Sequence, residues 1–146
     1  MTRNEAMTRV AAIDCGTNSI RLLVADGHID ESGRPRLADL TRQMRIVRLG
    51  QGVDARGYLD PAAIERTVEA TVEYQRMIEA LGATKTRFVA TSATRDASNS
   101  ADFVRQIKAV IGVEPEVVVG TEEASLSFNG AVSGLGESVA APMLVV

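Results

Sequence analysis

The sequence predicts an α/β fold in which a mixed five-stranded sheet is flanked by helices. Two observations carry this prediction. The N-terminal part holds three β-capable segments separated only by turn residues, which indicates an antiparallel meander. The rest of the chain alternates helical stripes with short apolar runs, which is typical of strands joined by helices. A meander followed by helix-separated strands favours a sheet with both strand orientations.

The first three strands are short and separated by turn chemistry. Apolar runs cover residues 10–13 and 20–25, and an extended stretch covers residues 35–48. Turns are expected at residues 26–28 and 32–33, where glycine lies next to aspartate, histidine or serine. The third strand counts among its apolar members Leu37, Leu40, Met44 and Ile46.

A long helix is predicted between residues 61 and 81. Asp60 suits the N-cap, Pro61 suits the first helical position, and Gly82 suits the C-cap. A buried strand is expected next, at residues 86–90. The face of the helix that turns to the core is formed by Ile64, Val68, Thr71, Val72, Ile78 and Leu81.

Two more helices and two more strands complete the predicted order. A helix ending at Gly112 precedes a strand at residues 116–119, and Thr121 is expected to cap a third helix. Residues 143–146 are expected to begin another strand. The second helix has a stripe of Phe103, Ile107, Val110 and Ile111, and the third an inner face of Ala124, Phe128, Ala131, Val132 and Leu135.

Composition excludes several classes of function. The chain has 146 residues, 45% of them hydrophobic, which is enough for one compact domain with a core. A net charge of −3 argues against a broad cationic face for duplex nucleic acid, although a few arginines can still hold phosphate locally. Cys15 and His28 are the only residues of their types, which disfavours a disulfide framework and a two-histidine metal site.

The sequence shows no segment for membrane targeting. No apolar run approaches the roughly 18 residues of a membrane span, and the start MTRNEAMTR lacks the apolar core of a signal peptide. We therefore expect a cytoplasmic protein that does not bind membranes. Residues 1–8 are expected to form a flexible tail, followed by one domain at residues 9–141.

A first candidate motif, DCGTNS at residues 14–19, lies in the turn between the first two strands. Gly16 permits a tight backbone there, and the residues after it can direct N–H groups and hydroxyls at a phosphate. Asp14, at the strand end, can hold Mg²⁺ through water, because this ion prefers few carboxylates and several waters. A plain hairpin turn explains the same residues without any ligand.

A second candidate motif, TSATR at residues 91–95, follows the strand at residues 86–90. Ligands usually lie at the carboxyl ends of strands in open α/β sheets. Arg95 offers a fork of donors to phosphate oxygens, while Thr91 and Ser92 offer hydroxyls. The alternative is a helix start with capping hydroxyls and a solvated arginine.

A third candidate motif, GTEEA at residues 120–124, opens the third helix. Glu122 and Glu123 have a simple explanation, because acidic residues in a first helical turn complement the helix dipole. The functional interpretation makes one of them a metal ligand or the carboxylate that orients a water. We expect all three motifs to converge at one rim of the sheet, where they supply what phosphoryl transfer to water needs.

The three motifs resemble those of the exopolyphosphatase and guanosine pentaphosphate phosphohydrolase family. Residues 12–24 (AIDCGTNSIRLLV) resemble its first phosphate motif, residues 91–95 its second signature, and residues 120–126 its third. The matches occur in the family's order along nearly the whole chain. The resemblance implies an actin-like, ribonuclease H-like fold and a hydrolase that releases terminal phosphate from inorganic polyphosphate, with Mg²⁺ as cofactor.

The resemblance also implies roles for individual residues. Glu123 would activate or orient the attacking water and Arg95 would bind phosphate near the scissile bond. Asp14 would lie near the magnesium, with Glu123 as a second candidate ligand. Arg21 faces either the core rim or the substrate. The remaining phosphate-binding candidates are Gly16, Thr17, Asn18, Ser19, Thr91 and Ser92.

One further family motif, an aspartate followed by a glycine-rich phosphate loop, should come directly after Val146. We therefore expect an N-terminal domain, with residues 142–146 beginning the first strand of a second one, and weak turnover or none by this chain alone. Guanosine pentaphosphate is the rival substrate, and a sensor that binds either polyanion without turnover is a rival function. A sugar kinase would also need a sugar-binding region, which is not found. The full-length protein is expected to form a homodimer.

Three remaining features receive plainer interpretations. Cys15 is interpreted as a small buried filler, because no basic partner is visible for it. His28 is expected to be exposed in a hairpin loop and inert. Arg42, Arg45 and Arg48 recur every three residues; a solvated face explains them, and steering of a polyanion toward the site is the alternative.

Overall fold

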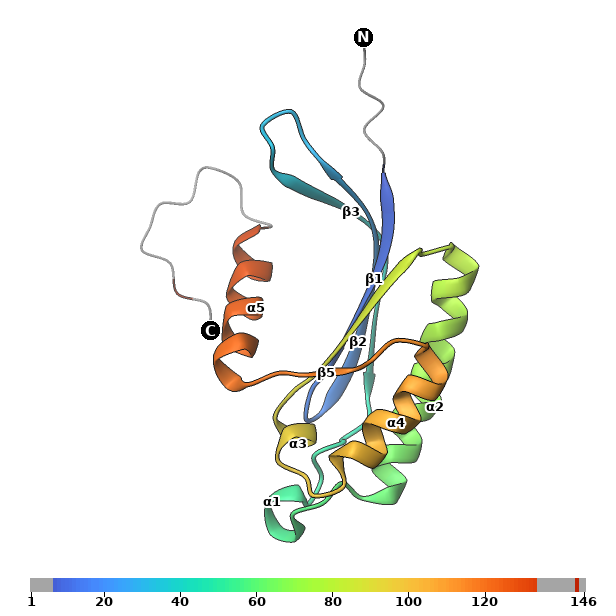
Figure 1. Cartoon of the computed structure of the whole chain (residues 1–146), viewed down its shortest axis with the longest axis vertical. Coiled ribbons are helices and arrows are strands. Elements are labelled where there is room, and N and C mark those ends of the chain that lie inside the picture. Colours follow the sequence, from blue (N-terminus) through green and yellow to red (C-terminus); the bar gives the residue numbers. More distant parts are fainter. Residues whose placement is uncertain (1–6, 134–143, 145–146) are drawn as a thin grey trace.

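A five-stranded mixed sheet organises the computed structural model, which describes residues 7–133 and 144 (Figure 1). The strand order is β3-β2-β1-β4-β5, with the first three strands antiparallel and β4 and β5 parallel to β1. The strands are β1 (Thr8–Cys15), β2 (Ser19–Ile29), β3 (Pro35–Ile46), β4 (Lys85–Ala90) and β5 (Glu116–Val117). The helices are α1 (Val53–Arg56), α2 (Pro61–Leu81), α3 (Ser92–Arg95), α4 (Ser100–Ile111) and α5 (Gly120–Ser133).

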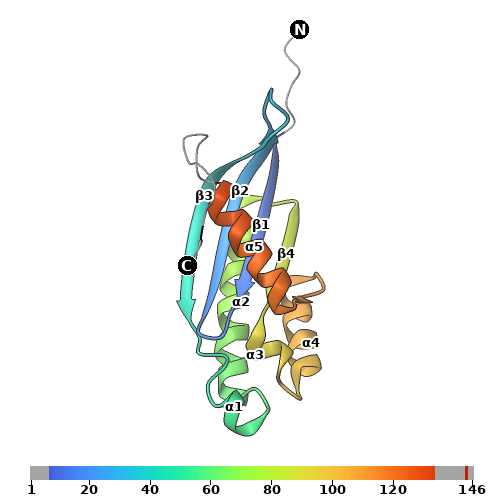
Figure 2. The ribbon, with the colours of Figure 1, turned by 90° about the vertical axis from the view of Figure 1, so that its left-hand side faces the viewer.

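The sequence predicts helices that flank the sheet, and in the structure they cover both of its faces. Helices α2 and α4 pack together on one face, and α5 crosses the opposite face (Figures 1 and 2). The core lies on the α2 and α4 side, where Tyr74, Phe88 and Phe103 are fully buried among aliphatic side chains. Aromatic residues make up only 3% of the chain. Aliphatic side chains from alternate positions of β1 and β2, such as Ile13 and Leu22, therefore fill much of the core.

Helix α2 begins and ends where the sequence predicts, and α4 ends at the predicted glycine. The Asp60 side chain accepts a hydrogen bond from the backbone N–H of Ala62, and Gly82 ends α2 with a φ of 71°. Gly112 ends α4 in the same left-handed conformation. Glycine reaches this conformation without the penalty that a Cβ atom brings, which explains its place at both helix ends.

The predicted turn at residues 26–28 is wrong. Strand β2 continues to Ile29, with His28 paired to Arg36 of β3, so His28 is half-buried in a strand and not exposed in a loop. The chain reverses instead at residues 30–34, where the Asp30 side chain accepts hydrogen bonds from Ser32 and Arg34. An Asx-type turn at Asp30 therefore sets the hairpin, and Gly27 is accommodated within the strand.

The third helix and its surroundings also differ from the sequence-based expectation. Helix α5 begins at Gly120, so Thr121 lies in its first turn and does not cap it, and β5 is only two residues long. None of its described residues is fully buried: Ala124, Phe128 and Ala131 are exposed and Val132 is half-buried. The apolar residues Leu37, Leu40, Met44 and Ile46 of edge strand β3 are exposed as well.

Some sequence-based expectations fall outside the described residues. These are Leu135 of the third helix, the strand expected at residues 143–146 apart from Leu144, and most of the N-terminal tail. Strand β1 already begins at Thr8, the last residue assigned to that tail. No helix in residues 7–133 is long and apolar enough to cross a lipid bilayer.

Candidate functional site

A cavity of about 540 Å³ lies between the sheet and α5. Residues of four strands form its floor, and Thr91 and three residues of α5 form its wall. Helix α5 crosses the face of the sheet opposite α2 and α4 (Figure 2). The lining residues are Ala12, Ile13, Asp14, Arg21, Leu22, Leu23, Arg42, Gln43, Met44, Arg87, Val89, Thr91, Glu123, Leu126 and Ser127.

Strand alternation directs Asp14 and Arg21 toward this cavity. Ile13 and Cys15 of β1 are buried in the core, so Asp14 between them faces the other way. Asp14 is paired with Arg21 across the antiparallel β1 and β2 strands. Cross-strand partners point to the same face of a sheet, and both side chains line the cavity. Arg21 therefore faces the cavity and not the core.

The surroundings of Asp14 raise its pKa. Its carboxyl group opens onto the cavity, but the sheet and the nearby wall remove part of its water, and this desolvation raises the pKa above the ordinary value. The positive charge of Arg21 opposes the shift and is the smaller effect. A cation bound beside Asp14 would lower its pKa and favour the ionised form.

The turn between β1 and β2 is fixed by hydrogen bonds from two other segments. Within it, the Gly16 N–H donates to the Ser19 carbonyl at 3.0 Å. The Asn18 carbonyl accepts from the N–H groups of Val47 and Arg48, both at 2.9 Å. Thr17 Oγ1 and Ser92 Oγ lie 3.1 Å apart, which joins the turn to the start of α3. The first two motifs therefore meet, as the sequence predicts.

Gly50 is a contributor to this turn that the sequence analysis missed. Its N–H donates to the Thr17 carbonyl at 2.9 Å, and a Cβ atom at Gly50 would lie 2.3 Å from Thr17 Cγ2 and 3.2 Å from Ala93 Cβ. Only a residue without a side chain lets the two segments approach so closely. At Gly16, by contrast, a Cβ atom would make an ordinary 3.5 Å contact with the Ser19 carbonyl. The Leu-Gly-Gln-Gly sequence at residues 49–52 is the only signal that pointed there.

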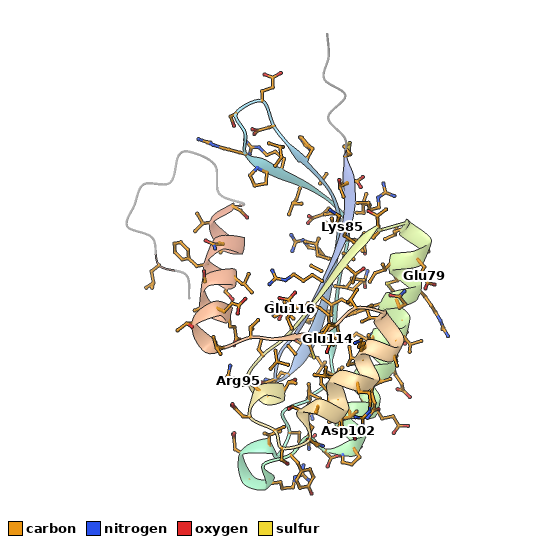
Figure 3. All side chains as sticks on the ribbon, in the orientation of Figure 1. Glu79, Lys85, Arg95, Asp102, Glu114 and Glu116 are labelled. Atoms are coloured by element: carbon orange, nitrogen blue, oxygen red, sulfur yellow. The ribbon has the colours of Figure 1, made fainter. Side chains whose placement is uncertain are left out.

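The second motif is only partly brought to the cavity. Thr91 lines it and is buried, and its N–H donates to the Cys15 carbonyl at 3.2 Å. Arg95 lies on α3 at the end of the sheet (Figure 3) and does not line the cavity. Its Nη1 donates to the Val118 carbonyl at 3.1 Å and its Nε to the Asp96 carboxylate at 3.2 Å. Arg95 therefore stands beside the segment that leads into α5.

The two glutamates of the third motif face different surroundings. Glu123 is half-buried and lines the cavity together with Asp14 and Arg21. Glu122 is exposed, does not line the cavity, and lies 3.9 Å from Arg87 Nη2. Helical geometry separates neighbouring residues by about 100°, which explains why only one of the pair faces the sheet. The helical pattern alone left both as candidates, and the family resemblance selected Glu123.

Two arginines of the cavity floor differ from the sequence-based expectations: Arg87 was not a candidate, and Arg42 was grouped with Arg45 and Arg48. Arg87 of β4 is bound through Nε and Nη2 to Glu116 of β5, at 2.9 and 2.7 Å. Arg42 lines the cavity, whereas Arg45, three residues on, is bound to Glu73 of α2 on the core side. The interval of three therefore does not produce one solvated face, because side chains in a strand alternate every two residues. Strand periodicity would have been the useful signal.

Cys15 is buried in the core beneath the motif. It is 1% exposed, and burial raises the pKa of its thiol to about 12, with a smaller contribution from the Asp14 charge. A thiol with so high a pKa holds no thiolate at neutral pH and is a poor nucleophile. The structure agrees with its interpretation as a packing residue.

The donor chemistry of the cavity fits a hard divalent cation. Asp14 and Glu123 supply two carboxylates from opposite sides, and Thr91 supplies a hydroxyl nearby. Within the described ranges no group of three histidine, cysteine, aspartate or glutamate side chains could hold a metal ion. Two carboxylates beside open space suit Mg²⁺, which keeps several waters, better than Zn²⁺, which is usually enclosed by nitrogen and sulfur ligands.

The chain is similar to curated proteins over most of its length. Exopolyphosphatase 2 of Mycobacterium tuberculosis is 51% identical over 97% of this chain and 45% of its own length. A bifunctional 3-dehydroquinate synthase/phosphatase of Fusobacterium nucleatum is 32% identical over 84% of this chain and 19% of its own length. The chain spans less than half the length of these relatives.

Solved structures share the fold. The crystal structure of the Aquifex aeolicus member of the Ppx/GppA family has a TM-score of 0.77 at 30% identity, covering 89% of this chain and 41% of that one. An exopolyphosphatase-like protein has the same TM-score at 45% identity, covering 84% of this chain and 36% of its own. A nucleoside triphosphate hydrolase of Neospora caninum, at 15% identity and a TM-score of 0.52, shares the fold alone. The predicted fold class, an actin-like mixed sheet with flanking helices, is confirmed.

A family model supports the same relationship independently of any single relative. The model of the Ppx/GppA phosphatase family matches residues 27–146, which include the second and third motifs. The match to the mycobacterial relative extends over the first motif as well, since it covers 97% of the chain. The chain belongs to the Ppx/GppA phosphatase family.

Proposed function

We propose that the protein carrying this chain hydrolyses the terminal phosphoanhydride bond of inorganic polyphosphate. One observation carries the proposal: Asp14, Arg21 and Glu123, from three separate elements, line one cavity beside the hydrogen-bonded β1–β2 turn. A cation, two carboxylates and a set of backbone N–H groups are what phosphoryl transfer to water requires. The similarity to a mycobacterial exopolyphosphatase supports polyphosphate as the substrate class.

In the proposed reaction, Glu123 orients the water that attacks the terminal phosphorus. The water oxygen forms the new P–O bond while the bridging oxygen leaves with the shortened chain and its electron pair. The turn residues Gly16 to Ser19 surround the phosphate, which accepts hydrogen bonds from backbone N–H groups after Gly16 and from the Thr17 hydroxyl. Gly16 shapes the turn, because its own N–H is bound to the Ser19 carbonyl. Arg21 balances negative charge that the phosphate brings onto the cavity floor.

The roles proposed for the second motif follow from its position. Thr91 lies in the cavity wall and Ser92 holds the Thr17 hydroxyl, so both support the phosphate turn. Arg95 is proposed to bind phosphate near the scissile bond with the guanidinium nitrogen that its two hydrogen bonds leave free. Among the described residues, Nη2 of Arg95 has no partner.

Mg²⁺ is proposed as the cofactor, held by Asp14 with Glu123 as second ligand. When bound, this ion neutralises phosphate charge and polarises the reacting phosphoryl group. Its positive charge would also stabilise the ionised form of Asp14, whose pKa is raised by desolvation. Thr91 can orient one of the waters that such an ion retains.

A cytoplasmic location and a homodimer of the full-length protein are further parts of the proposal. The single cysteine, Cys15, is free and buried, which fits a reducing compartment where disulfides do not form. Strand β3 presents a long open edge, with exposed Leu37 and Ile46, to which another chain can add. Sedimentation velocity on the full-length protein tests the dimer.

The substrate is tested with the full-length protein and two matched substrates. We expect Mg²⁺-dependent orthophosphate release from long-chain polyphosphate, and loss of release when EDTA removes the ion. If orthophosphate is released from guanosine pentaphosphate and not from polyphosphate, guanosine pentaphosphate is the substrate. Tight binding of polyphosphate without release, by the intact protein with Mg²⁺, would contradict the hydrolase and favour a sensor.

A further inference from the structure

We propose that Arg42 forms a second phosphate subsite, which binds the inner phosphates of a long polyphosphate while the terminal phosphate lies at the β1–β2 turn. The inference rests on the proposed function, because it describes where the rest of that substrate lies. It makes Arg42 a residue that determines preference for chain length. The same cavity thereby holds both the reacting end and the chain behind it.

The sheet register places Arg42 on the floor of the cavity, away from the turn. Leu23 of β2 is paired with Arg42 of β3 and with Ala12 of β1, so the three residues cross the floor in one row. Asp14, Arg21 and Met44 form the neighbouring row, closer to the turn. Strands lie about 4.8 Å apart, so Arg42 stands roughly 10 Å from the β1 position of its row. A ligand at the turn must extend across β2 to reach it.

A β-bulge gives Arg42 a fixed starting orientation. Val24 is paired with Thr41 and Ala25 with Asp39, so Leu40 is an additional residue in β3. This extra residue changes the alternation and brings Asp39 and Arg42 to one side, where Nε of Arg42 donates to Oδ2 of Asp39. The two terminal guanidinium nitrogens have no partner among the described residues. Both remain available to bind phosphate oxygens.

Charge favours the β3 side of the floor over the β4 side. Arg87, at the β4 end of the row, is bound by Glu116 on two nitrogens and approached by Glu122, so two carboxylates surround one cation. Arg21 makes no hydrogen bond or ion pair within residues 7–133, and Arg42 has one carboxylate in an exposed pair. Exposed pairs contribute little, so a polyanion can compete with Asp39 for Arg42. A polyanion therefore extends from the turn over Arg21 toward Arg42.

Arg45 provides a matched control for Arg42. Both residues are exposed arginines of β3, three positions apart, and each is paired with one carboxylate. Arg45 contacts Glu73 of α2 on the core side and does not line the cavity. Arg42→Gln and Arg45→Gln therefore remove the same charge from the same strand, on opposite faces. General electrostatic steering would respond to both, whereas a subsite responds only to Arg42.

The experiment measures kcat and KM of the full-length protein for long-chain polyphosphate and for tripolyphosphate. We expect Arg42→Gln to raise KM for the long chain about 5- to 10-fold, as loss of one charge-assisted contact does. It should leave kcat and the tripolyphosphate values nearly unchanged. Arg45→Gln should leave all four values unchanged, and Asp39→Asn should lower the long-chain KM because it frees Arg42.

Binding provides a second readout that does not depend on turnover. The Glu123→Gln protein and the double variant Glu123→Gln, Arg42→Gln are titrated with long-chain polyphosphate in a calorimeter. The double variant should bind about 5- to 10-fold more weakly, which matches the expected rise in KM. Equal effects of Arg42→Gln and Arg45→Gln, or an equal effect on both substrates, would overturn the subsite while leaving the hydrolase intact. If the unmodified protein neither binds polyphosphate nor releases orthophosphate from it, both proposals are overturned.

Discussion

The hydroxyl of Thr17 in the β1–β2 turn and the hydroxyl of Ser92 at the start of α3 lie 3.1 Å apart. This contact joins residues that are 75 positions apart in the chain and holds the β1–β2 turn against the end of β4. It also orients the Thr17 hydroxyl, which a turn alone would leave free to rotate.

Replacement of Ser92 by alanine is expected to loosen the turn without unfolding the domain. One neutral hydrogen bond contributes about 1 kcal/mol, so KM for polyphosphate should rise roughly 5-fold, with a smaller loss in kcat. Ser98→Ala is the control, because no hydrogen bond of the Ser98 side chain is found among the described residues. Steady-state kinetics with both variants decide the matter, and similar values for the two would contradict this role of Ser92.

Replacement of Gly50 by alanine is expected to displace the β1–β2 turn. The new Cβ atom would lie 2.3 Å from Thr17 Cγ2, and overpacking of this kind costs about 1–3 kcal/mol. Chemical denaturation should show this loss of unfolding free energy, and phosphate affinity should fall with it.

A second substitution separates the clash from other effects at Gly50. Thr17→Ser removes the methyl group that clashes and keeps the hydroxyl, so it should recover part of the stability lost in Gly50→Ala. Gly130→Ala in α5 meets no atom within 4 Å and should be neutral or stabilising. No recovery in the double variant would show that the contact with Thr17 is not the cause.

Asp14→Asn is expected to stabilise the protein at neutral pH while removing activity. The pKa of Asp14 is raised in the folded state, so its ionisation opposes folding; this cost is absent below its unfolded pKa and appears as pH rises through the folded value. The Tm difference between variant and parent should therefore be positive at pH 7 and shrink on acidification. Measurements use metal-free buffer, and a Tm difference independent of pH would contradict the desolvation argument.

Cys15 is expected to resist thiol reagents in the folded protein. It is buried, and its pKa of about 12 leaves no thiolate at neutral pH. Iodoacetamide at pH 7.5 should label it only after unfolding in guanidinium chloride, as mass spectrometry can report. Rapid labelling of the native protein, at a rate near that of the unfolded chain, would show that the thiol is accessible and not a core residue.

The sequence predicts well what local rules control. Asp60, Pro61 and Gly82 mark the ends of α2 because capping depends on the residue itself and its near neighbours. The meander and the two crossovers follow from the same local patterns. Of the candidate site residues, Asp14, Arg21, Thr91 and Glu123 line one cavity. Asp14 and Thr91 lie at strand ends, Arg21 is the cross-strand partner of Asp14, and Glu123 lies in the first turn of the helix that follows β5.

What the sequence could not predict depends on contacts between distant segments. The close approach of Gly50 to Thr17 has no local signature, since it arises only when residues 47–50 pack against the turn. Strand β2 runs through Gly27 and His28 because pairing with β3 outweighs their turn preference. The helical pattern alone does not tell which of Glu122 and Glu123 faces the sheet, because this depends on where α5 begins. The family resemblance selected Glu123, the one that lines the cavity.

The most direct test of the central claim compares Glu123→Gln with Glu122→Gln in the full-length protein. Both remove one carboxylate from the first turn of α5, but only Glu123 lines the cavity. Orthophosphate release from polyphosphate with Mg²⁺ should fall at least 100-fold in Glu123→Gln, as loss of a catalytic carboxylate typically causes, and stay within about 3-fold of the parent in Glu122→Gln. Undiminished release by Glu123→Gln, or equal losses in the two variants, would contradict the assignment of the reaction to this cavity.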